Sequence, residues 1–379
     1  MSTIKLLHTA DVHLDAPNGS LGPRAAELRE RTWSAWDSAI DQALELGIQL
    51  FIVAGDLFDV RLPAARTVER ALSGIRRLAE ATPAVETVLL PGTHDCWAEG
   101  ALWDSPRIKA LAERVHLLRG PEAESVHIPH LDVMVHGCAH RCDIRGQRPV
   151  CELRASSEAT INIGVAHGSW ERGDISEDSS MYSDAEIAAT GLDYLALGHW
   201  HSFFDVSSGG VTAVNPGSPE VPGFGNWDRG SVAVVTLGDG PALVQRVEVG
   251  SLISETVEVD AADLSGTEDL ISRLEEHADR DRLLEVRLSG LAAPGVMIDT
   301  ELAMERLADA CFALRIRDRS HPALDEFDDE ALDERLTLGR FVKLARKQIE
   351  AANDDRERRV AERALQVGVS MLRRERGAK

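Results

Sequence analysis

Five short motifs rich in Asp, His and Gly mark the chain up to His201, and each follows directly after a short aliphatic run. In order they are Asp11-Val12-His13, Gly55-Asp56-Leu57-Phe58-Asp59, Gly92-Thr93-His94-Asp95, His167-Gly168 and Gly198-His199-Trp200-His201. Carboxylate oxygens and imidazole nitrogens without thiolates suit manganese, iron or zinc better than calcium or an iron–sulfur cluster. Because the motifs supply more such side chains than one ion needs, they predict a two-metal site.

The aliphatic runs before these motifs have the length and composition of buried β-strands. They lie at residues 4–7, 50–53, 85–90, 161–165 and 194–197, and turn residues bound each run. We therefore expect every motif at the carboxyl end of a strand, which is where open α/β sheets bind their ligands.

Helical patterns alternate with the first strands, and further strands follow. The predicted helices lie at residues 24–46, 64–81 and 105–112, and the later strands at 131–136, 211–214, 231–237 and 242–247. Parallel units followed by antiparallel strands predict an α/β fold in which a two-sheet sandwich is flanked by helices.

The chain of 379 residues is too long for one ordinary hydrophobic core, so we expect more than one domain. The prediction is a catalytic sandwich domain at residues 1–250 and a small α/β capping domain at 251–320. Inside the capping domain, the pattern predicts a helix at 268–278, a strand at 283–288 and a second helix at 299–314. Residues 321–379 are predicted to form an acidic linker and C-terminal helices that bind a partner.

Two amphipathic helices are expected after the acidic segment 325–330. One apolar face consists of Leu338, Phe341, Val342, Ala345 and Ile349, and the other of Ala361, Ala364, Leu365, Gly368 and Leu372. These faces either form a helical hairpin packed on its own domain or offer a docking site for a partner helix, which an exposed linker favours.

Composition indicates a globular protein in a reducing compartment. Hydrophobic residues make up 44% of the chain, and nothing approaches the roughly 18 consecutive apolar residues of a membrane span. The first strand begins at Ile4 without a charged and then apolar leader before it. The five cysteines are odd in number and few for the length, which argues against a secreted disulfide framework. We therefore expect a cytoplasmic protein with no membrane association.

The formal net charge of -22 is unfavourable for DNA binding, because phosphate contacts normally come from Lys and Arg. From Arg340 to Lys379, however, basic residues outnumber acidic ones by about two to one. The acidity therefore lies in the rest of the chain. That part could still hold DNA if bound cations offset the local field and a partner supplied a basic channel.

The five motifs, in this order, resemble the calcineurin-like metallophosphoesterase superfamily, whose general pattern is DxH, GDxxD, GNH(D/E), H and GHxH. Within it, three segments resemble the SbcD-type DNA repair exonuclease branch: residues 8–15, the run Asn215-Pro216-Gly217-Ser218-Pro219 and the run Arg229-Gly230-Ser231-Val232. The resemblance is most specific over residues 4–235. It implies a manganese-dependent DNA nuclease that works with an SMC-like coiled-coil ATPase, held by the C-terminal helices, in DNA end processing or repair. A homodimer is compatible with it.

The resemblance also implies a role for each motif residue. The first of two divalent ions, expected to be Mn2+, would be held by Asp11, His13 and His201. The second would be held by His167 and His199, and Asp56 would bridge the pair. The catalytic residue would be His94, which lies beside the ions and protonates the leaving oxygen or stabilises the transition state, with Asp95 as the residue that orients it. Asp59 is expected to support the site or its turn.

One residue departs from the pattern, since Thr93 stands where the family has Asn. In the family, the amide oxygen of that Asn completes the coordination of the second metal. A threonine hydroxyl reaches less far and is a weaker ligand. The second ion is therefore expected to bind less tightly here, or to be a different ion. This departure keeps open a scaffold subunit whose metal site is weakened. The negative charge keeps open a stand-alone phosphoesterase that acts on a small nucleotide-type substrate.

A second group of potential ligands surrounds the predicted strand end at His136. It comprises His136, Cys138, His140, Cys142 and Cys151. His and Cys at these intervals could hold a structural zinc ion. The group lacks a CxxC pair, and alternate side chains of a strand face opposite sides, so an ordinary strand end is the competing interpretation.

Overall fold

The computed structural model describes residues 3–111, 113–120, 122–142, 144–171, 180–225, 229–293, 296–322, 336–352 and 354–377. The chain forms two compact units, Met1–Ser254 and Glu255–Lys379. The acidic segment 325–330 lies outside the described residues, and the division into three domains stays a prediction.

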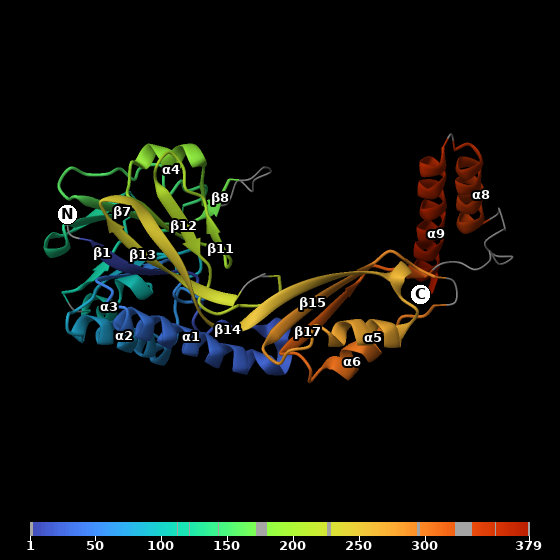
Figure 1. Ribbon diagram of the computed structural model, residues 1–379, viewed down its shortest axis with the longest axis horizontal. Coiled ribbons are helices and arrows are strands. Elements are labelled where there is room, and N and C mark those ends of the chain that lie inside the picture. The colour runs from blue at the N-terminus through green and yellow to red at the C-terminus, as the bar shows by residue number, and fades with distance from the viewer. Residues whose placement is uncertain are drawn as a thin grey trace. The chain divides into compact units, whose positions relative to one another are not determined.

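The first unit is built on two sheets, and the strands that carry the first three motifs are parallel neighbours in one of them (Figure 1). The strands that the first unit contributes to this sheet are, in spatial order, β14 (Gly240–Asp260), β13 (Arg229–Gly238), β1 (Ile4–Thr9), β2 (Leu50–Ala54), β3 (Glu86–Leu90) and β4 (Val115–Leu117). The last residues of β14, from Glu255, belong to the second unit. The register sets Leu6 opposite Leu50, and Leu50 opposite Glu86.

The second sheet carries the last two motifs on β7 and β10, which are also parallel neighbours. Its strands are, in spatial order, β11 (Phe203–Asp205), β12 (Thr212–Pro216), β10 (Tyr194–Gly198), β7 (Ile161–His167), β6 (Val133–Gly137) and β5 (Glu124–Ile128). A short pair, β8 (Ser169–Trp170) and β9 (Met181–Tyr182), follows β7.

Helices cover the outer faces of both sheets (Figure 1). Those beside the first sheet are α1 (Ala25–Glu45), α2 (Ala65–Glu80) and α3 (Pro106–Lys109), and α4 (Asp184–Thr190) lies beside the second. The first two agree with the predicted helices at 24–46 and 64–81, whereas α3 is a single turn, shorter than the predicted 105–112.

The alternation of side chains along the strands separates the two faces of each sheet. In β2, Leu50 and Ile52 join the core between the sheets together with Ile163 of β7. Phe51 points the other way and meets Trp36 of α1, with their ring centroids 5.9 Å apart. The predicted α/β fold with two sheets flanked by helices is therefore confirmed.

The second unit contains a small α/β lobe with its own core. Its elements are α5 (Thr267–Glu275), β15 (Arg282–Ser289), α6 (Thr300–Leu307) and β17 (Ala313–Asp318), with β15 parallel to β17, and a short pair β16 (Leu291–Ala292) and β18 (His321–Pro322). The predicted helix at 299–314 is wrong at its end, because β17 begins at Ala313. The apolar residues Leu307, Cys311 and Leu314 fit a helical spacing, and this spacing hid the strand.

The C-terminal helices form a hairpin, α8 (Thr337–Glu350) with α9 (Asp355–Gly377), whose apolar faces pack on each other. Leu338, Val342 and Ala345 of α8 share a buried cluster with Leu365 and Val369 of α9. The faces predicted from the sequence therefore largely cover each other, which leaves the outer surface of the hairpin for any partner. Among the described residues, no helix has both the length and the apolar composition that crossing a bilayer requires.

Trp103 links this fold to the site, and its removal should destabilise the protein. The side chain is 1% exposed, packs against Phe58 and donates a hydrogen bond to the carbonyl of Asp95. We predict that Trp103→Ala lowers the free energy of unfolding by about 3–5 kcal/mol, because it leaves a cavity. Urea titration followed by circular dichroism measures the loss. Leu243→Ala, at a side chain that is 72% exposed, is the control and should cost less than about 0.5 kcal/mol; equal effects of the two would refute the prediction.

Candidate metal centre

The predicted site residues meet at the carboxyl ends of strands from both sheets. Asp11 and His13 follow β1, Asp56 follows β2, and His94 follows β3. In the second sheet, His167 ends β7, and the run from 199 to 201 follows β10. Close packing of the sheets thus brings together residues that are 188 positions apart, as in the hydrogen bond from the backbone N–H of His199 to the Asp11 carboxylate.

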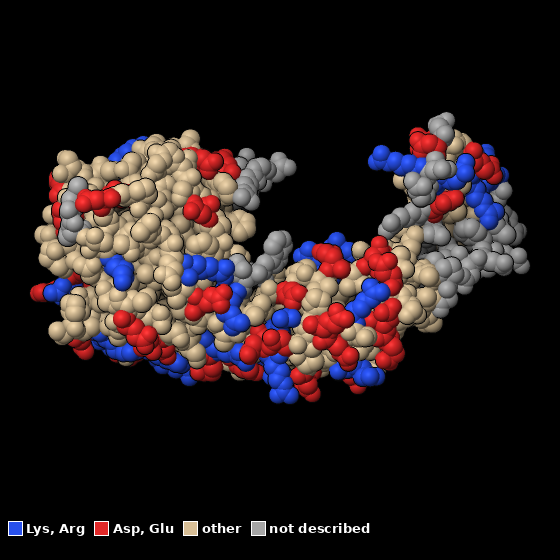
Figure 2. All heavy atoms as spheres, in the orientation of Figure 1, with Lys and Arg blue, Asp and Glu red and all other residues tan. Residues whose placement is uncertain are grey.

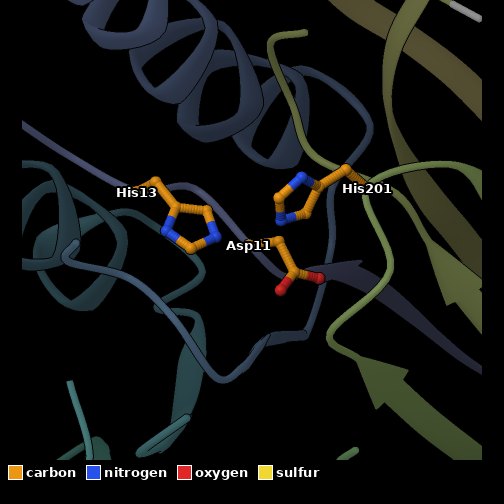
Figure 3. A group of neighbouring side chains, drawn as sticks. All are labelled: Asp11, His13 and His201. Carbon is orange, nitrogen blue, oxygen red and sulfur yellow. The ribbon is translucent and has the colours of Figure 1, made fainter. Parts of the chain in front are cut away.

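Asp11, His13 and His201 form one group of potential ligands, shown in Figure 3. One potential ligand atom from each residue lies within 4.8 Å of the others. The rings of His13 and His201 are 5.0 Å apart, centroid to centroid. The backbone N–H of His199 donates to both carboxylate oxygens of Asp11, at 2.8 and 3.0 Å, and so fixes its orientation.

Asp56 lies at the centre of the remaining contacts. It forms one group of potential ligands with Asp11 and His167, and another with His13 and His94. Its Oδ2 is 3.3 Å from Nε2 of His167 and 3.8 Å from Nε2 of His13. Nδ1 of His167 lies 2.9 Å from the carbonyl oxygen of Ala54, which turns Nε2 toward the centre. A carboxylate in this position can bridge two ions.

His199 joins none of the ligand groups found among the described residues. Its ring packs edge-on against that of His167, with the centroids 5.3 Å apart. The side chain therefore lies beside the centre, next to a residue that belongs to it.

Four of these residues adopt positive φ angles, which non-glycine residues rarely do. The angles are 53° at Asp11, 50° at His13, 52° at Asp56 and 114° at His199. Each such residue costs on the order of 1–3 kcal/mol and persists where surrounding contacts hold it, typically at functional sites. The sharp turns after β1, β2 and β10 are therefore maintained against a local cost.

Two glycines of the motifs are required by close approach. A Cβ at Gly92 would lie 2.3 Å from Oδ1 of Asp56, and a Cβ at Gly55 would lie 2.2 Å from Nδ1 of His167. Neither contact leaves room for a side chain. The glycines of the Gly55-Asp56 and Gly92-Thr93-His94 motifs are therefore explained by close packing of the centre, whereas the Asp and His residues are its potential ligands.

The electrostatics of the site favour a bound cation. Burial lowers the pKa of His201 to about 3 and, with His167, that of His199 to about 4, so both rings are neutral at neutral pH. Neutral imidazole is the form that binds metals. Nε2 of His13 is buried and has no hydrogen-bond partner among the described residues, although it points toward Asp56. This orphaned nitrogen and the mixed oxygen and nitrogen donors fit divalent transition-metal ions.

His94 lies at the rim, with a side chain that is 49% exposed. Its Nδ1 is 3.2 Å from the carbonyl oxygen of Asp59 and 3.4 Å from the Asp59 carboxylate. The hydrogen bond to Asp59 raises the pKa of His94 to about 9 despite partial burial, so the ring is protonated at neutral pH. A protonated imidazole at the rim can act as a general acid.

Asp59, rather than Asp95, orients His94, which corrects the expectation from the sequence. The carboxylate of Asp95 is fully buried and accepts hydrogen bonds from the backbone N–H groups of Gly92, at 2.7 Å, and Phe58, at 3.1 Å. Asp95 therefore ties the loop after β3 to the loop after β2. Asp59 supports the site as expected, and its Oδ1 lies 3.0 Å from Nδ1 of His13.

The hydroxyl of Thr93 faces the part of the centre where the second ion is expected. It donates to Oδ2 of Asp56 at 3.0 Å and is 3.5 Å from Nε2 of His167. The hydroxyl thus lies near the residues expected to hold the second ion, and it is engaged with a carboxylate instead of being free to face a cation.

The cysteine region is arranged differently from a zinc site. Cys142 forms a disulfide with Cys96, a pairing that the sequence analysis did not predict, with the Cα atoms 5.5 Å apart. Both ring nitrogens of His136 are engaged, one with Ser125 at 2.8 Å and one with Asn162 at 3.1 Å. None of the ligand groups found among the described residues lies here. The strand-end interpretation therefore fits this region.

His140 follows β6 in the second sheet and belongs to none of the ligand groups found among the described residues.

The chain is similar to several known proteins. It is 25% identical over 288 residues to the uncharacterized metallophosphoesterase YhaO of Bacillus subtilis strain 168, covering 73% of this chain and 68% of that protein. It is 24% identical over 260 residues to the DNA double-strand break repair protein Mre11 of Saccharolobus solfataricus, covering 63% of this chain and 62% of that protein. The chain thus spans less than two thirds of this Mre11.

A solved structure, TT1561 of Thermus thermophilus, matches with 12% identity and a TM-score of 0.39, covering 65% of this chain and 99% of that one. Residues 4–203, which include every motif, match the family described as calcineurin-like phosphoesterase. Because this match covers more than half of the sequence, the chain belongs to the calcineurin-like phosphoesterase family.

Proposed function

We propose that this chain is a manganese-dependent DNA nuclease that processes DNA ends together with an SMC-like coiled-coil ATPase. The observation that carries the proposal is the gathering of two Asp and four His side chains into overlapping ligand groups at the strand ends, among them a protonated His94 at the rim. Families of this kind use a dinuclear divalent metal site. Six residues are proposed as the ligands of the two ions: Asp11, His13, Asp56, His167, His199 and His201.

The proposed chemistry assigns separate tasks to the ions and to the side chains. When bound, the two ions supply positive charge for the phosphate and acidify the attacking water. Asp56 would be shared by the two ions, and the neutral imidazoles of His199 and His201 would add nitrogen donors without adding negative charge. His94 then donates its proton to the leaving oxygen, and Asp59 holds the imidazolium in place.

DNA as the substrate is supported by the resemblance to the SbcD-type branch and by the similarity to a protein named for double-strand break repair. On the face of the first unit seen in Figure 2, most of the surface is uncharged, and the acidic and basic side chains lie intermixed, mainly along the edge formed by α1 and α2. Such a face offers little general attraction for a phosphate backbone. The proposal therefore assigns most DNA affinity to the bound ions and to the ATPase, with the complex in the cytoplasm.

A small nucleotide-type phosphodiester is the second candidate substrate, and the net charge of -22 favours it. One assay separates the two. Purified protein is incubated with Mn2+ and end-labelled duplex DNA, with and without the ATPase, and in parallel with nucleotides and a generic phosphodiester. Cleavage of DNA that increases with the ATPase supports the proposal. Hydrolysis of nucleotides without any DNA cleavage under either condition would favour the second candidate, and no hydrolysis of any substrate would favour a scaffold role.

His94→Ala should lower phosphodiester hydrolysis by about 100-fold or more, because general acid catalysis is lost. Bound manganese, measured by elemental analysis, should stay near the wild-type level. His13→Ala is the matched comparison and should lose metal along with activity. His94 also falls in a ligand group with His13 and Asp56, so it could instead bind metal. Loss of bound manganese from His94→Ala would show that His94 is a ligand and not the general acid.

Thr93→Asn should tighten the binding of the second manganese ion, because an amide oxygen reaches farther than the hydroxyl of Thr93. That hydroxyl is hydrogen-bonded to Asp56. Calorimetric titration with Mn2+ should show a stronger second binding step, with the first step unchanged. Thr93→Val, which removes the hydroxyl at similar volume, is the control and should not tighten either step. An unchanged or weaker second step in Thr93→Asn would show that this site does not need the amide.

Removal of the helical hairpin should end binding of the ATPase while sparing the site. A chain truncated after Asp333 should keep the melting temperature of the first unit and the hydrolysis of a generic phosphodiester, because the faces of α8 and α9 cover each other. It should no longer co-purify with the ATPase. Leu344→Asp changes an exposed residue of the intact hairpin, 64% exposed, and should weaken the same interaction. Retained co-purification of the truncated chain, or a much lower melting temperature, would contradict the docking role.

A further inference from the structure

The loop after β6 brings another imidazole, that of His140, to the loop that carries the catalytic histidine. The backbone N–H of His140 donates to the carbonyl oxygen of Pro91 at 3.3 Å, and its carbonyl accepts from the N–H of Trp97 at 3.0 Å. These two bonds hold His140 against both ends of the segment that contains Thr93 and His94. The position of His140 is therefore tied to the centre through the main chain.

Further contacts fix this loop. Cys142 is joined to Cys96 by the disulfide, and the guanidinium carbon of Arg141 lies 4.5 Å from the ring centroid of Trp97. The backbone N–H of Arg141 also donates to Oε1 of Gln147 at 2.9 Å. Covalent, cation–π and hydrogen-bond contacts thus place the residue in advance, as ligand positions require.

The side chain of His140 has a buried nitrogen with no protein partner. Among the described residues, Nδ1 of His140 forms no hydrogen bond although it is shielded from solvent. A buried polar atom left in this state costs on the order of 1–3 kcal/mol. A bound ion or its water would satisfy this nitrogen.

The groups that act electrostatically on His140 are those expected around the second ion. Burial and then the neighbouring His167 lower the pKa of His140 to about 4, while Asp56 opposes the change. His140 in turn contributes to the lowered pKa of His199, after burial and His167. The geometry agrees with this, since β6 is the parallel neighbour of β7, with Gly137 opposite Val165, so the loop that carries His140 leaves the sheet at the same edge as His167.

We propose that His140 is a further nitrogen ligand of the second ion and compensates for Thr93, which replaces the Asn of the family pattern. The inference rests on the proposed two-ion centre but does not depend on DNA as the substrate. A neutral imidazole would add a strong donor for manganese or zinc without adding charge. This chain would then hold its second ion with a donor from the β6 loop, where the family pattern takes one from the β3 loop.

Calorimetric titration with Mn2+, supported by electron paramagnetic resonance of the coupled ion pair, tests this inference. His140→Ala should weaken the second binding step by about 10-fold or more and reduce the coupled-pair signal, because a ligand is lost. His140→Gln keeps a polar side chain of similar size and guards against misfolding. His127→Ala, at an exposed histidine of the neighbouring strand β5, is the control and should match wild type.

The outcomes separate this inference from the function it builds on. Two wild-type-like binding steps in both folded His140 variants would overturn the His140 assignment alone. A wild-type chain that binds only one ion would overturn the two-ion centre, and the assignment with it.

A double variant tests whether residues 93 and 140 serve the same ion. Thr93→Asn should tighten the second step more strongly in the His140→Ala background than in wild type, because the amide then replaces a missing donor. Residues that share a partner show such non-additive effects, whereas independent residues add. Strictly additive changes in affinity would therefore refute a shared ion.

Discussion

A single buried carboxylate, that of Asp56, is the constraint on which the centre depends. It is 2% exposed, and an ionised carboxylate at such a depth costs several kcal/mol unless hydrogen bonds and opposite charge compensate. The compensation comes from the backbone N–H of His94, the hydroxyl of Thr93 and the ring of His167. These groups belong to two sheets, so the register of the strands and the packing between the sheets must be correct before this charge can be buried.

The same arrangement explains how an acidic chain can attract a phosphate. The only carboxylates in the ligand groups found among the described residues are those of Asp11 and Asp56, and every other member is an imidazole. With two divalent ions present, the centre would be locally positive although the chain as a whole is strongly negative. Bound ions are the largest charges in their surroundings. Their attraction for a phosphate therefore outweighs the repulsion from acidic side chains that lie farther away.

The sequence predicted the strands of the first unit, and the meeting of the motif residues at their carboxyl ends, because both leave local patterns. Aliphatic runs such as 50–53 mark buried strands, and parallel strands bring their carboxyl ends to one edge. Contacts between distant loops leave no such pattern. The partner of His94 was assigned to Asp95, its neighbour in sequence, whereas Asp59 from another loop holds it. The disulfide of Cys96 with Cys142 and the place of His140 likewise depend on how β3 and β6 face each other across the sandwich.

The disulfide also restricts how the centre can move. The loop after β3 carries His94, and the loop after β6 carries His140; a covalent bond between Cys96 and Cys142 obliges them to move as one body. The bond therefore limits how far either loop can move away from the other. Reduction of this bond would remove the covalent tie, so the freedom of the loop that carries His94 depends on the thiol–disulfide balance of the surroundings.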